Sequence, residues 1–278
     1  MLRNVVAIMY DFDKTLSPKD MQEYGFIPSL GYLRTEDFWK TVSEQAKKHR
    51  MDQILSYMKC MLDQAKASGK PLTRSGLASL AEGVALFPGV EEWFDLINQE
   101  GKRRGLVIEH YIVSSGLKEI IEGTTIARHF KEIYACEYVY TEDVAVWPAQ
   151  AVNYTTKTQY IFRINKGVLD VNESERLNAF VPHRERKVPF ENMIYIGDGM
   201  TDIPCMRLVL EKGGNSIAIY NEHSEKSKHD VRTLVRDGRV NYCASADYRD
   251  GKQMHQIVSA ILDQVKAKVE LSHYETFE

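Results

Sequence analysis

Short apolar runs alternate with helical patterns along most of the chain. Runs rich in β-branched or aromatic residues predict strands, and apolar residues spaced at i, i+3 and i+4 predict helices. The predicted strands cover residues 5–10, 106–114, 133–140, 193–197 and 216–220, with a possible hairpin through 144–152. The predicted helices cover 90–100, 117–127, 157–165, 202–212 and 254–265. This alternation predicts an α/β fold with a doubly wound, mostly parallel, Rossmann-like sheet.

Residues 17–85 interrupt the alternation. The stretch 35–68 is rich in Lys, Glu, Gln, Ala, Met and Leu at helical spacing, a second helical piece covers 76–85, and Pro88-Gly89 marks a boundary. We therefore predict a small α-helical cap domain at 17–85, inserted in a core domain made of 1–16 and 86–278. The insert's Met51, Met58, Met61 and Trp39 favour a bundle core over a hydrophobic substrate pocket.

Two further segments lie outside the alternating pattern. The charged stretch 166–189 predicts one helix and a surface loop, with no chemistry attached to it. The tail 269–278 falls outside the apolar stripe of the last helix, and we expect it to fray.

Composition limits the classes of protein. Hydrophobic residues make up 44% of the chain, charged residues make up 27%, and the formal net charge is −3, so we expect neither nucleic acid nor a membrane as partner. Cys60, Cys136, Cys205 and Cys243 are far apart and belong to no C-x-x-C or zinc pattern. Free thiols and a cytoplasmic location are the expectation.

The candidate chemistry begins in the first strand, VVAIMYDFDKTL. Asp11 and Asp13 follow an apolar run that is typical of a strand buried on both faces, and their spacing places both at the strand's carboxyl end. One carboxylate would act as a nucleophile that accepts a phosphoryl group, and the other would exchange protons. The alternative is a polar turn in which the two acids bond to nearby amides.

Ser114 and Lys157 are candidate phosphate ligands. Ser114 ends a predicted strand and precedes Ser115-Gly116, so its hydroxyl and the amides of the turn would bind phosphate oxygens. It could equally cap the following helix. Lys157 would open a helix and place its ammonium against the phosphate, and Lys166 is the rival lysine.

The stretch IYIGDGMTD, residues 194–202, places Asp198 after another strand and Asp202 four residues later. A Gly-rich turn near a helix start is the plain alternative. Four acids in one crevice would repel each other, whereas oxygen ligands with room for water and phosphate suit Mg²⁺. The cluster therefore predicts a Mg²⁺ site.

The chain resembles the haloacid dehalogenase-like superfamily in four motifs that occur in this order: DFDKTL, IVSSG, Lys157 and GDGMTD. More closely, they resemble the phosphoserine phosphatase-like branch, whose helical cap follows the first motif. The resemblance implies Asp11 as nucleophile and Asp13 as acid and base, with Thr15 orienting the site. It implies Ser114 and Lys157 at the phosphate. It implies Mg²⁺ held by Asp11, the Asp13 carbonyl and Asp198, with Asp202 as the second acid of that loop.

Two departures from that branch concern the substrate. Asp20 stands where a Glu that recognises a substrate amino group is usual, and Ser115 stands where a Gly is usual. They argue against phosphoserine. The expected activity is Mg²⁺-dependent hydrolysis of a small phosphomonoester through a phosphoaspartate. The alternatives are a phosphotransferase or mutase of the same superfamily, or a non-catalytic protein that binds a phosphorylated ligand. The oligomeric state is open.

Overall fold

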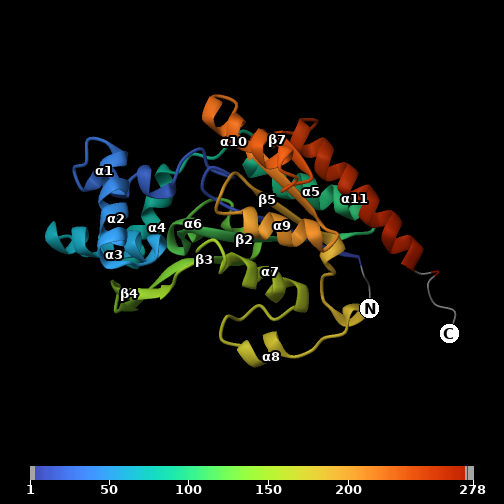
Figure 1. Cartoon of the computed structure of the whole chain (residues 1–278), viewed down its shortest axis with the longest axis horizontal. Helices are drawn as coiled ribbons and strands as arrows, with labels where there is room; N and C mark the ends of the chain where they lie inside the picture. Colours follow the sequence, from blue (N-terminus) through green and yellow to red (C-terminus); the bar gives the residue numbers. More distant parts are fainter. Residues whose placement is uncertain (1–3, 273, 275–278) are drawn as a thin grey trace.

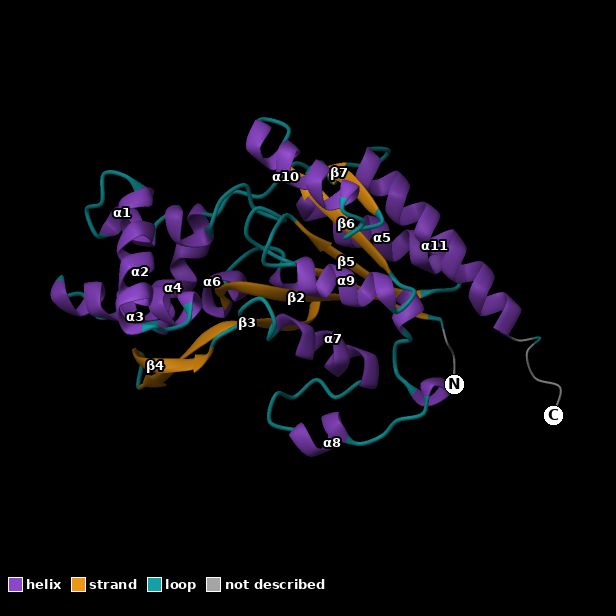
Figure 2. Ribbon diagram, in the orientation of Figure 1, coloured by secondary structure: helices purple, strands orange, loops and turns teal. Residues whose placement is uncertain are grey.

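The computed structural model describes residues 4–272 and 274, and these form a seven-stranded sheet (Figures 1 and 2). The strand order is β4-β3-β2-β1-β5-β6-β7; neighbours pair in parallel except β4, which is antiparallel to β3. The strands are β1 (Val5–Tyr10), β2 (Val107–Leu117), β3 (Phe130–Thr141), β4 (Val144–Gln150), β5 (Met193–Gly197), β6 (Asn215–Tyr220) and β7 (Tyr242–Ser245). The predicted α/β fold, including the hairpin, is confirmed.

The helices fall into an N-terminal group and a group that covers the sheet. The first group is η1 (Met21–Glu23), α1 (Phe26–Ser29), α2 (Thr35–His49), α3 (Gln53–Ala67), α4 (Arg74–Ser79) and η2 (Leu80–Gly83). The others are α5 (Val90–Arg103), α6 (Lys118–Glu122), η3 (Ala127–His129), α7 (Lys157–Lys166), α8 (Ser174–Asn178), η4 (His183–Glu185), η5 (Phe190–Asn192), α9 (Ile203–Glu211), α10 (Glu225–Arg236) and α11 (Gln253–Ser272).

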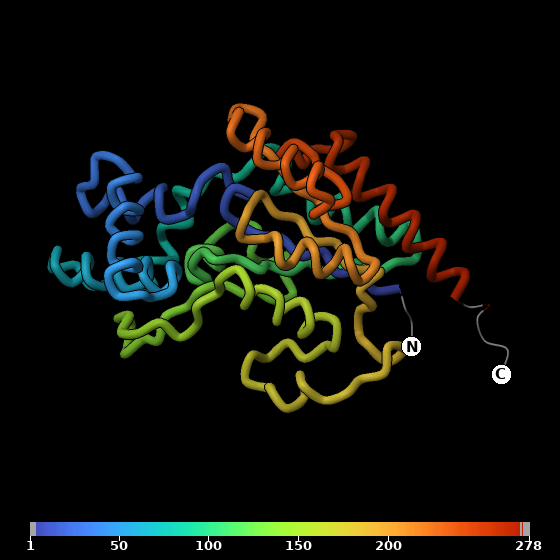
Figure 3. Tube along the Cα trace, in the orientation of Figure 1, coloured from blue at the N-terminus to red at the C-terminus, as the bar shows by residue number. Residues whose placement is uncertain are grey.

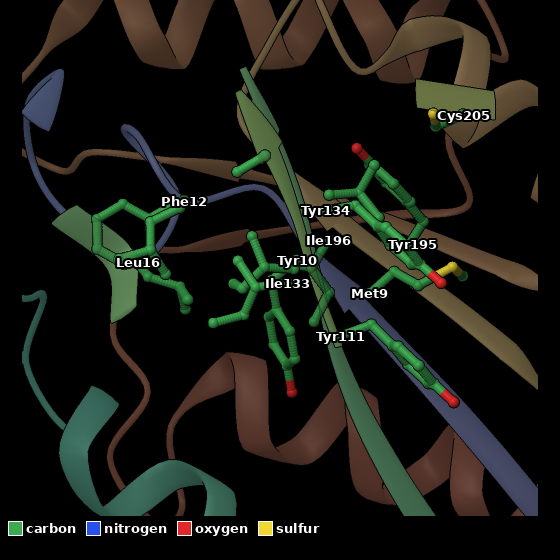
Figure 4. Close-up of a cluster of buried hydrophobic side chains, with 14 of the residues drawn as sticks. Met9, Tyr10, Phe12, Leu16, Tyr111, Ile133, Tyr134, Tyr195, Ile196 and Cys205 are labelled. Carbon is green, nitrogen blue, oxygen red and sulfur yellow. The ribbon is translucent and has the colours of Figure 1, made fainter. Parts of the chain in front are cut away.

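The core lies on both faces of the central strand β1, every residue of which is buried. Alternate side chains of a strand point to opposite faces, and β1 follows this rule. Tyr10 packs against Trp93 and Phe94 of α5, which in turn contacts α11. Met9 pairs in register with Tyr195 of β5, whose hydroxyl reaches the start of α9 on the other face (Figure 4). Helices therefore cover both faces of the sheet.

The order of the strands reverses direction at β1. From β1 the chain continues through β2 and β3 towards one edge, and β5, β6 and β7 lie on the other side of β1. In open α/β sheets, ligands bind in the crevice outside the carboxyl ends of the strands at such a switch point. The fold thus places the ends of β1 and β5 side by side, with Tyr10 opposite Ile196.

The helices α1 to α4 lie together at one end of the sheet (Figure 1). α2 ends at Arg50, whose φ of 52° is left-handed, and Asp52 caps α3 by accepting from the amides of Ile54 and Leu55. Met58 and Met61 are buried in the core, as the bundle interpretation predicts. The division into a 17–85 cap and a surrounding core stays a prediction.

Several predicted boundaries were wrong. β2 does not end at Ser114 but continues to Leu117, and the helix expected over 117–127 is only the five residues of α6. α10 and β7 were not predicted: α10 is so polar that it buries only Val231 and Leu234, and β7 has four residues. α11 continues to Ser272, so the expected fraying is contradicted for 269–272; residues 273 and 275–278 lie outside the described part.

The segment 166–189 carries the predicted short helix, α8, in a long loop (Figure 3). The buried Arg163 donates to the carbonyls of Asp170 and Val171, at 2.6 and 2.8 Å. Lys166 donates to the carbonyls of Leu177 and Ala179. Two cations of α7 therefore fix this loop through main-chain oxygens.

The four cysteines are free thiols, as predicted, and three of them are buried. Among the described residues, no helix combines the length and apolar character needed to cross a membrane.

Candidate active site

Asp11 stands directly after β1, at the switch point of the sheet. Its amide extends the parallel ladder by donating to the carbonyl of Ile196 at 2.9 Å, and one of its carboxylate oxygens accepts from the amide of Phe12 at 2.7 Å. The side chain is buried. These bonds fix the carboxylate at the strand's end, where the sequence places the nucleophile.

Lys157 lies beneath the carboxylates, at the first position of α7. Its Nζ is 3.0 Å from Asp11 Oδ2 and 2.7 Å from Asp202 Oδ1, and the lysine is fully buried. Burial by itself would lower the pKa of Lys157, but the two carboxylates outweigh it and the pKa lies well above its usual value. Lys157 is therefore charged at the site, whereas the ammonium of the rival Lys166, at the other end of α7, bonds to carbonyls of the loop described above.

Asp11, Asp198 and Asp202 form a cluster in which one carboxylate oxygen from each lies within 4.8 Å of the others. Gly197 makes this approach possible, since a Cβ there would lie 2.5 Å from Asp202 Oδ2. That buried oxygen has no hydrogen-bond partner, while Oδ1 accepts from Lys157 and from Tyr195. Three carboxylates in one cluster, one of them with a buried oxygen that accepts no hydrogen bond, suit a divalent cation.

The charge balance of this cluster favours a further cation. Burial, followed by Asp202 and Asp11, raises the pKa of Asp198 well above its usual value. Burial and Asp11 raise the pKa of Asp202 to about 6 despite the contact with Lys157. A metal ion would remove this repulsion and keep the carboxylates ionised.

Asp13 occupies a different position from the three clustered acids. Its Oδ1 accepts from the amide of Met21 at 2.8 Å, and its side chain is outside the three-carboxylate cluster. Burial raises the pKa of Asp13 well above its usual value, and the charges of Asp20 and Asp11 add to the effect. A carboxyl group that retains its proton beside a buried carboxylate is suited to general acid catalysis.

The Ser114-Ser115-Gly116 segment forms the last part of β2. Ser114 is buried and its Oγ accepts from the amide of Gly116 at 3.1 Å, while Leu117 is the residue before α6. The interpretation of Ser114 as a helix cap is therefore wrong. Gly116 is required by close approach, because a Cβ there would overlap Met21 Cε and lie 3.0 Å from Asp13 Oδ2.

A cavity of about 350 Å³ opens above these groups. It is lined by most of the predicted site residues: Asp11, Asp13, Asp20, Ser114, Ser115 and Asp198. Lys157 and Asp202 are buried below it. Thr15 and Gly116 are not part of the lining; the carbonyl of Thr15 accepts from Tyr248, and its buried hydroxyl has no partner.

The cavity also contains residues that sequence reasoning did not assign to the site. Its wall on the helical side is formed by Trp39 of α2, Ile54 and Tyr57 of α3, and Gln22 of η1. The lining is completed by Lys14, Gly199, Met200 and Thr201. For Trp39 the sequence favoured the core of a helical bundle over a hydrophobic pocket, whereas the structure places it in the cavity lining. No local sequence pattern assigns Gln22, Ile54 or Tyr57 to the site, because which face of a helix meets the cavity depends on how the helices dock.

The sequence profile of the haloacid dehalogenase-like hydrolases matches residues 8–207. The chain belongs to this family. An uncharacterized protein of Borreliella burgdorferi is 27% identical to it over 91% of this chain and 94% of its own length.

Solved structures show the same fold. A haloacid dehalogenase family hydrolase from Salmonella enterica serovar Typhi has a TM-score of 0.58 at 19% identity, over 94% of this chain and 72% of its own. A phosphoserine phosphatase in a phospho-aspartyl intermediate analogue form has a TM-score of 0.54 at 14% identity, over 92% and 99%. A substrate-bound phosphoserine phosphatase has a TM-score of 0.54 at 16% identity, over 92% and 97%. The fold is thus shared with the branch that the motifs resemble.

Proposed function

We propose that this protein is a Mg²⁺-dependent phosphatase that hydrolyses a small phosphomonoester through a phosphoaspartate on Asp11. The observation that carries the proposal is the position of Asp11, between the buried ammonium of Lys157 and the carboxylates of Asp198 and Asp202. A phospho-aspartyl intermediate analogue is among the structures of similar fold, which supports this assignment.

The first half-reaction transfers the phosphoryl group to the protein. Asp11 attacks phosphorus in line, so that an Asp11 oxygen–phosphorus bond forms while the bond from phosphorus to the leaving oxygen breaks. Asp13 gives its proton to the leaving oxygen. Lys157 stabilises negative charge on the transferring group, and the hydroxyl of Ser114 is placed to bind one of its oxygens.

The second half-reaction regenerates the enzyme. Asp13, now ionised, takes a proton from water as the water oxygen attacks phosphorus, and the bond to Asp11 breaks. Inorganic phosphate leaves with the Asp11 carboxylate restored. The same two carboxylates thus serve both steps, Asp11 as nucleophile and leaving group, Asp13 as acid and then base.

Asp11, Asp198 and Asp202 would hold Mg²⁺, together with the main-chain carbonyl of Asp13. The unpartnered Asp202 Oδ2 and the raised pKa of Asp198 fit a site built for a cation. Bound there, Mg²⁺ neutralises phosphate charge.

We expect the protein to be cytoplasmic because its four thiols are free.

The test measures phosphate release from a panel of phosphomonoesters, with Mg²⁺ or with EDTA. We expect release that depends on Mg²⁺ and an acid-stable, hydroxylamine-labile phosphoenzyme. Asp11→Asn should abolish both, whereas Asp95→Asn, at an exposed position of α5, serves as the matched control. Full turnover by Asp11→Asn would disprove the nucleophile assignment. Transfer of the phosphoryl group to an added alcohol in preference to water would identify a phosphotransferase instead, and binding of phosphate without turnover would identify a non-catalytic protein.

A further inference from the structure

The wall of the cavity that faces the leaving group comes from the helical insert. Asp20, Gln22, Trp39, Ile54 and Tyr57 form it, opposite the reacting Asp11. A volume of about 350 Å³ is small among ligand pockets, which span roughly 300–1,000 Å³. The phosphoryl group occupies part of it, so the remaining space suits a leaving group of about one ring.

Asp20, the charged residue of this wall, is paired with Lys14, which also lines the cavity. Both carboxylate oxygens of Asp20 accept from Lys14 Nζ, at 2.8 and 2.6 Å. The two side chains therefore form a close ion pair. A substrate ammonium would therefore have to displace Lys14 from Asp20, and a second anion would have to displace Asp20 from Lys14.

The aromatic residues of the wall present no free hydrogen-bond donor. Trp39 Nε1 donates to Glu23 at 3.1 Å, and the Tyr57 hydroxyl donates to the carbonyl of Ser115 at 2.7 Å. Their rings stand at 74° to each other, with centroids 6.1 Å apart. Because the Trp39 and Tyr57 donors are both occupied, what their rings and Ile54 offer the ligand is mainly apolar surface.

Gln22 differs from these aromatic residues because one of its polar atoms is left unpaired. It is 2% exposed, it lines the cavity, and its Oε1 has no hydrogen-bond partner among the described residues. Buried polar atoms are nearly always paired, so an unpaired amide oxygen at a ligand cavity indicates a donor supplied by the ligand.

We propose that this cavity selects phosphomonoesters with an uncharged leaving group that has a flat apolar face and a hydrogen-bond donor, and that Gln22 recognises the donor. The flat face packs against Trp39 and Tyr57. Aminoalkyl phosphates such as O-phosphoserine are excluded because Asp20 is already paired with Lys14. This inference rests on the proposed phosphatase activity.

The test compares kcat/KM between matched substrates in the presence of Mg²⁺. Hydroxyphenyl and methylphenyl phosphates differ by a donor at nearly constant size. We expect one hydroxyl isomer to exceed its methyl counterpart about tenfold, which corresponds to the net contribution of one hydrogen bond. We also expect 2-hydroxyethyl phosphate to be a better substrate than phosphoethanolamine.

Substitutions at Gln22 and Lys14, with one control, assign these preferences to residues. Gln22→Met should bring the hydroxyl-to-methyl ratio close to one without lowering the melting temperature, because it removes a buried unpaired acceptor. Gln99→Met on the exposed side of α5 is the control and should keep the wild-type ratio. Lys14→Met should shift the preference towards phosphoethanolamine by freeing Asp20. If Gln22→Met is poorly folded, Gln22→Glu provides the second readout, with the same shift towards phosphoethanolamine.

The outcomes separate this inference from the function on which it rests. If no phosphomonoester is hydrolysed in a Mg²⁺-dependent way, the proposed function fails and the inference fails with it. If hydrolysis occurs but phosphoethanolamine or O-phosphoserine is preferred, the inference alone is wrong. A hydroxyl-to-methyl ratio that Gln22→Met leaves unchanged likewise overturns only the inference.

Discussion

The hydroxyl of Tyr57, on helix α3, donates to the main-chain carbonyl of Ser115, on strand β2, at 2.7 Å. The bond crosses from the helical insert to the strand that carries the candidate phosphate ligand Ser114. Two further bonds connect α3 to the sheet region: Tyr138 donates to the carbonyl of Met58, and Asn153 donates to Asp52. These bonds hold α3 against the part of the sheet that borders the cavity.

Tyr57→Phe removes one of these contacts and keeps the ring. We expect a modest loss of stability, about 1 kcal/mol, and a several-fold fall in kcat/KM because the docked arrangement becomes less populated. Hydrogen exchange of α2 and α3 amides should accelerate. Tyr32→Phe is the matched control, since the Tyr32 hydroxyl only accepts from Gln64 within the insert. Equal effects of the two substitutions would show that the Tyr57 contact does not couple the insert to the site.

Lys157→Met tests the buried ammonium. Removing the cation leaves Asp11 and Asp202 facing each other, and breaking a buried ion pair costs about 3–5 kcal/mol. We expect that loss in urea unfolding with EDTA, and a fall in kcat of about 10²-fold or more with Mg²⁺.

Lys166→Met is the comparison for that lysine, because its ammonium bonds only to main-chain oxygens of the 166–189 loop. We expect retained activity, with a loss of order confined to the loop. If Lys166→Met lost activity while Lys157→Met kept it, the choice between the two lysines would be reversed.

Asp13→Asn separates the two half-reactions. An aryl phosphate with a good leaving group needs little help from an acid, so the nitrophenolate should appear in a burst close to one equivalent per enzyme. The following steady state should be slower by about 10²-fold or more, because no base activates water. Stopped-flow absorbance with p-nitrophenyl phosphate measures both phases, and wild type is the reference. Uniform slowing without a burst would contradict the assigned role.

His110 predicts a dependence of stability on pH. Its Nδ1 lies 3.0 Å from the Tyr10 hydroxyl, and burial, with a smaller contribution from His129, lowers the pKa of His110 to about 3. The unfolded chain, with a pKa of about 6.5, binds a proton that the folded protein does not. The stability from neutral His110 is therefore complete above pH 6.5 and is lost as the pH falls towards 3, by about 2 kcal/mol at pH 5.

The measurement is the free energy of urea unfolding at pH 7 and pH 5. His110→Asn keeps an acceptor for the Tyr10 hydroxyl and should show a smaller loss between these values than wild type. His49→Asn, at the exposed end of α2, should follow wild type. Identical pH dependence in His110→Asn and wild type would disprove the attribution.

The sequence by itself determined the sheet and the acids at the carboxyl ends of its strands. An apolar strand such as β1, followed at once by Asp11, has few alternatives to a buried parallel strand, because only burial on both faces explains an uninterrupted apolar run. The motif order then predicted which strand ends meet. Its errors fell where local signals are weak. β2 extends past Ser114 because Leu117 pairs again with Cys136 of β3, after an irregularity that follows Val113. α10 has aliphatic residues only in its second half, so its apolar stripe is short.

Only the tertiary structure decided which residues surround the leaving group and which lysine faces Asp11. Lys157 and Lys166 both lie on α7, and it is the rotation of that helix against β2 and α9 that buries one beneath the acids. In the same way, Gln22 and Tyr57 reach the cavity because separate helices dock near the carboxyl ends of the strands. Such contacts join residues far apart in the chain, and no periodicity within one segment encodes them.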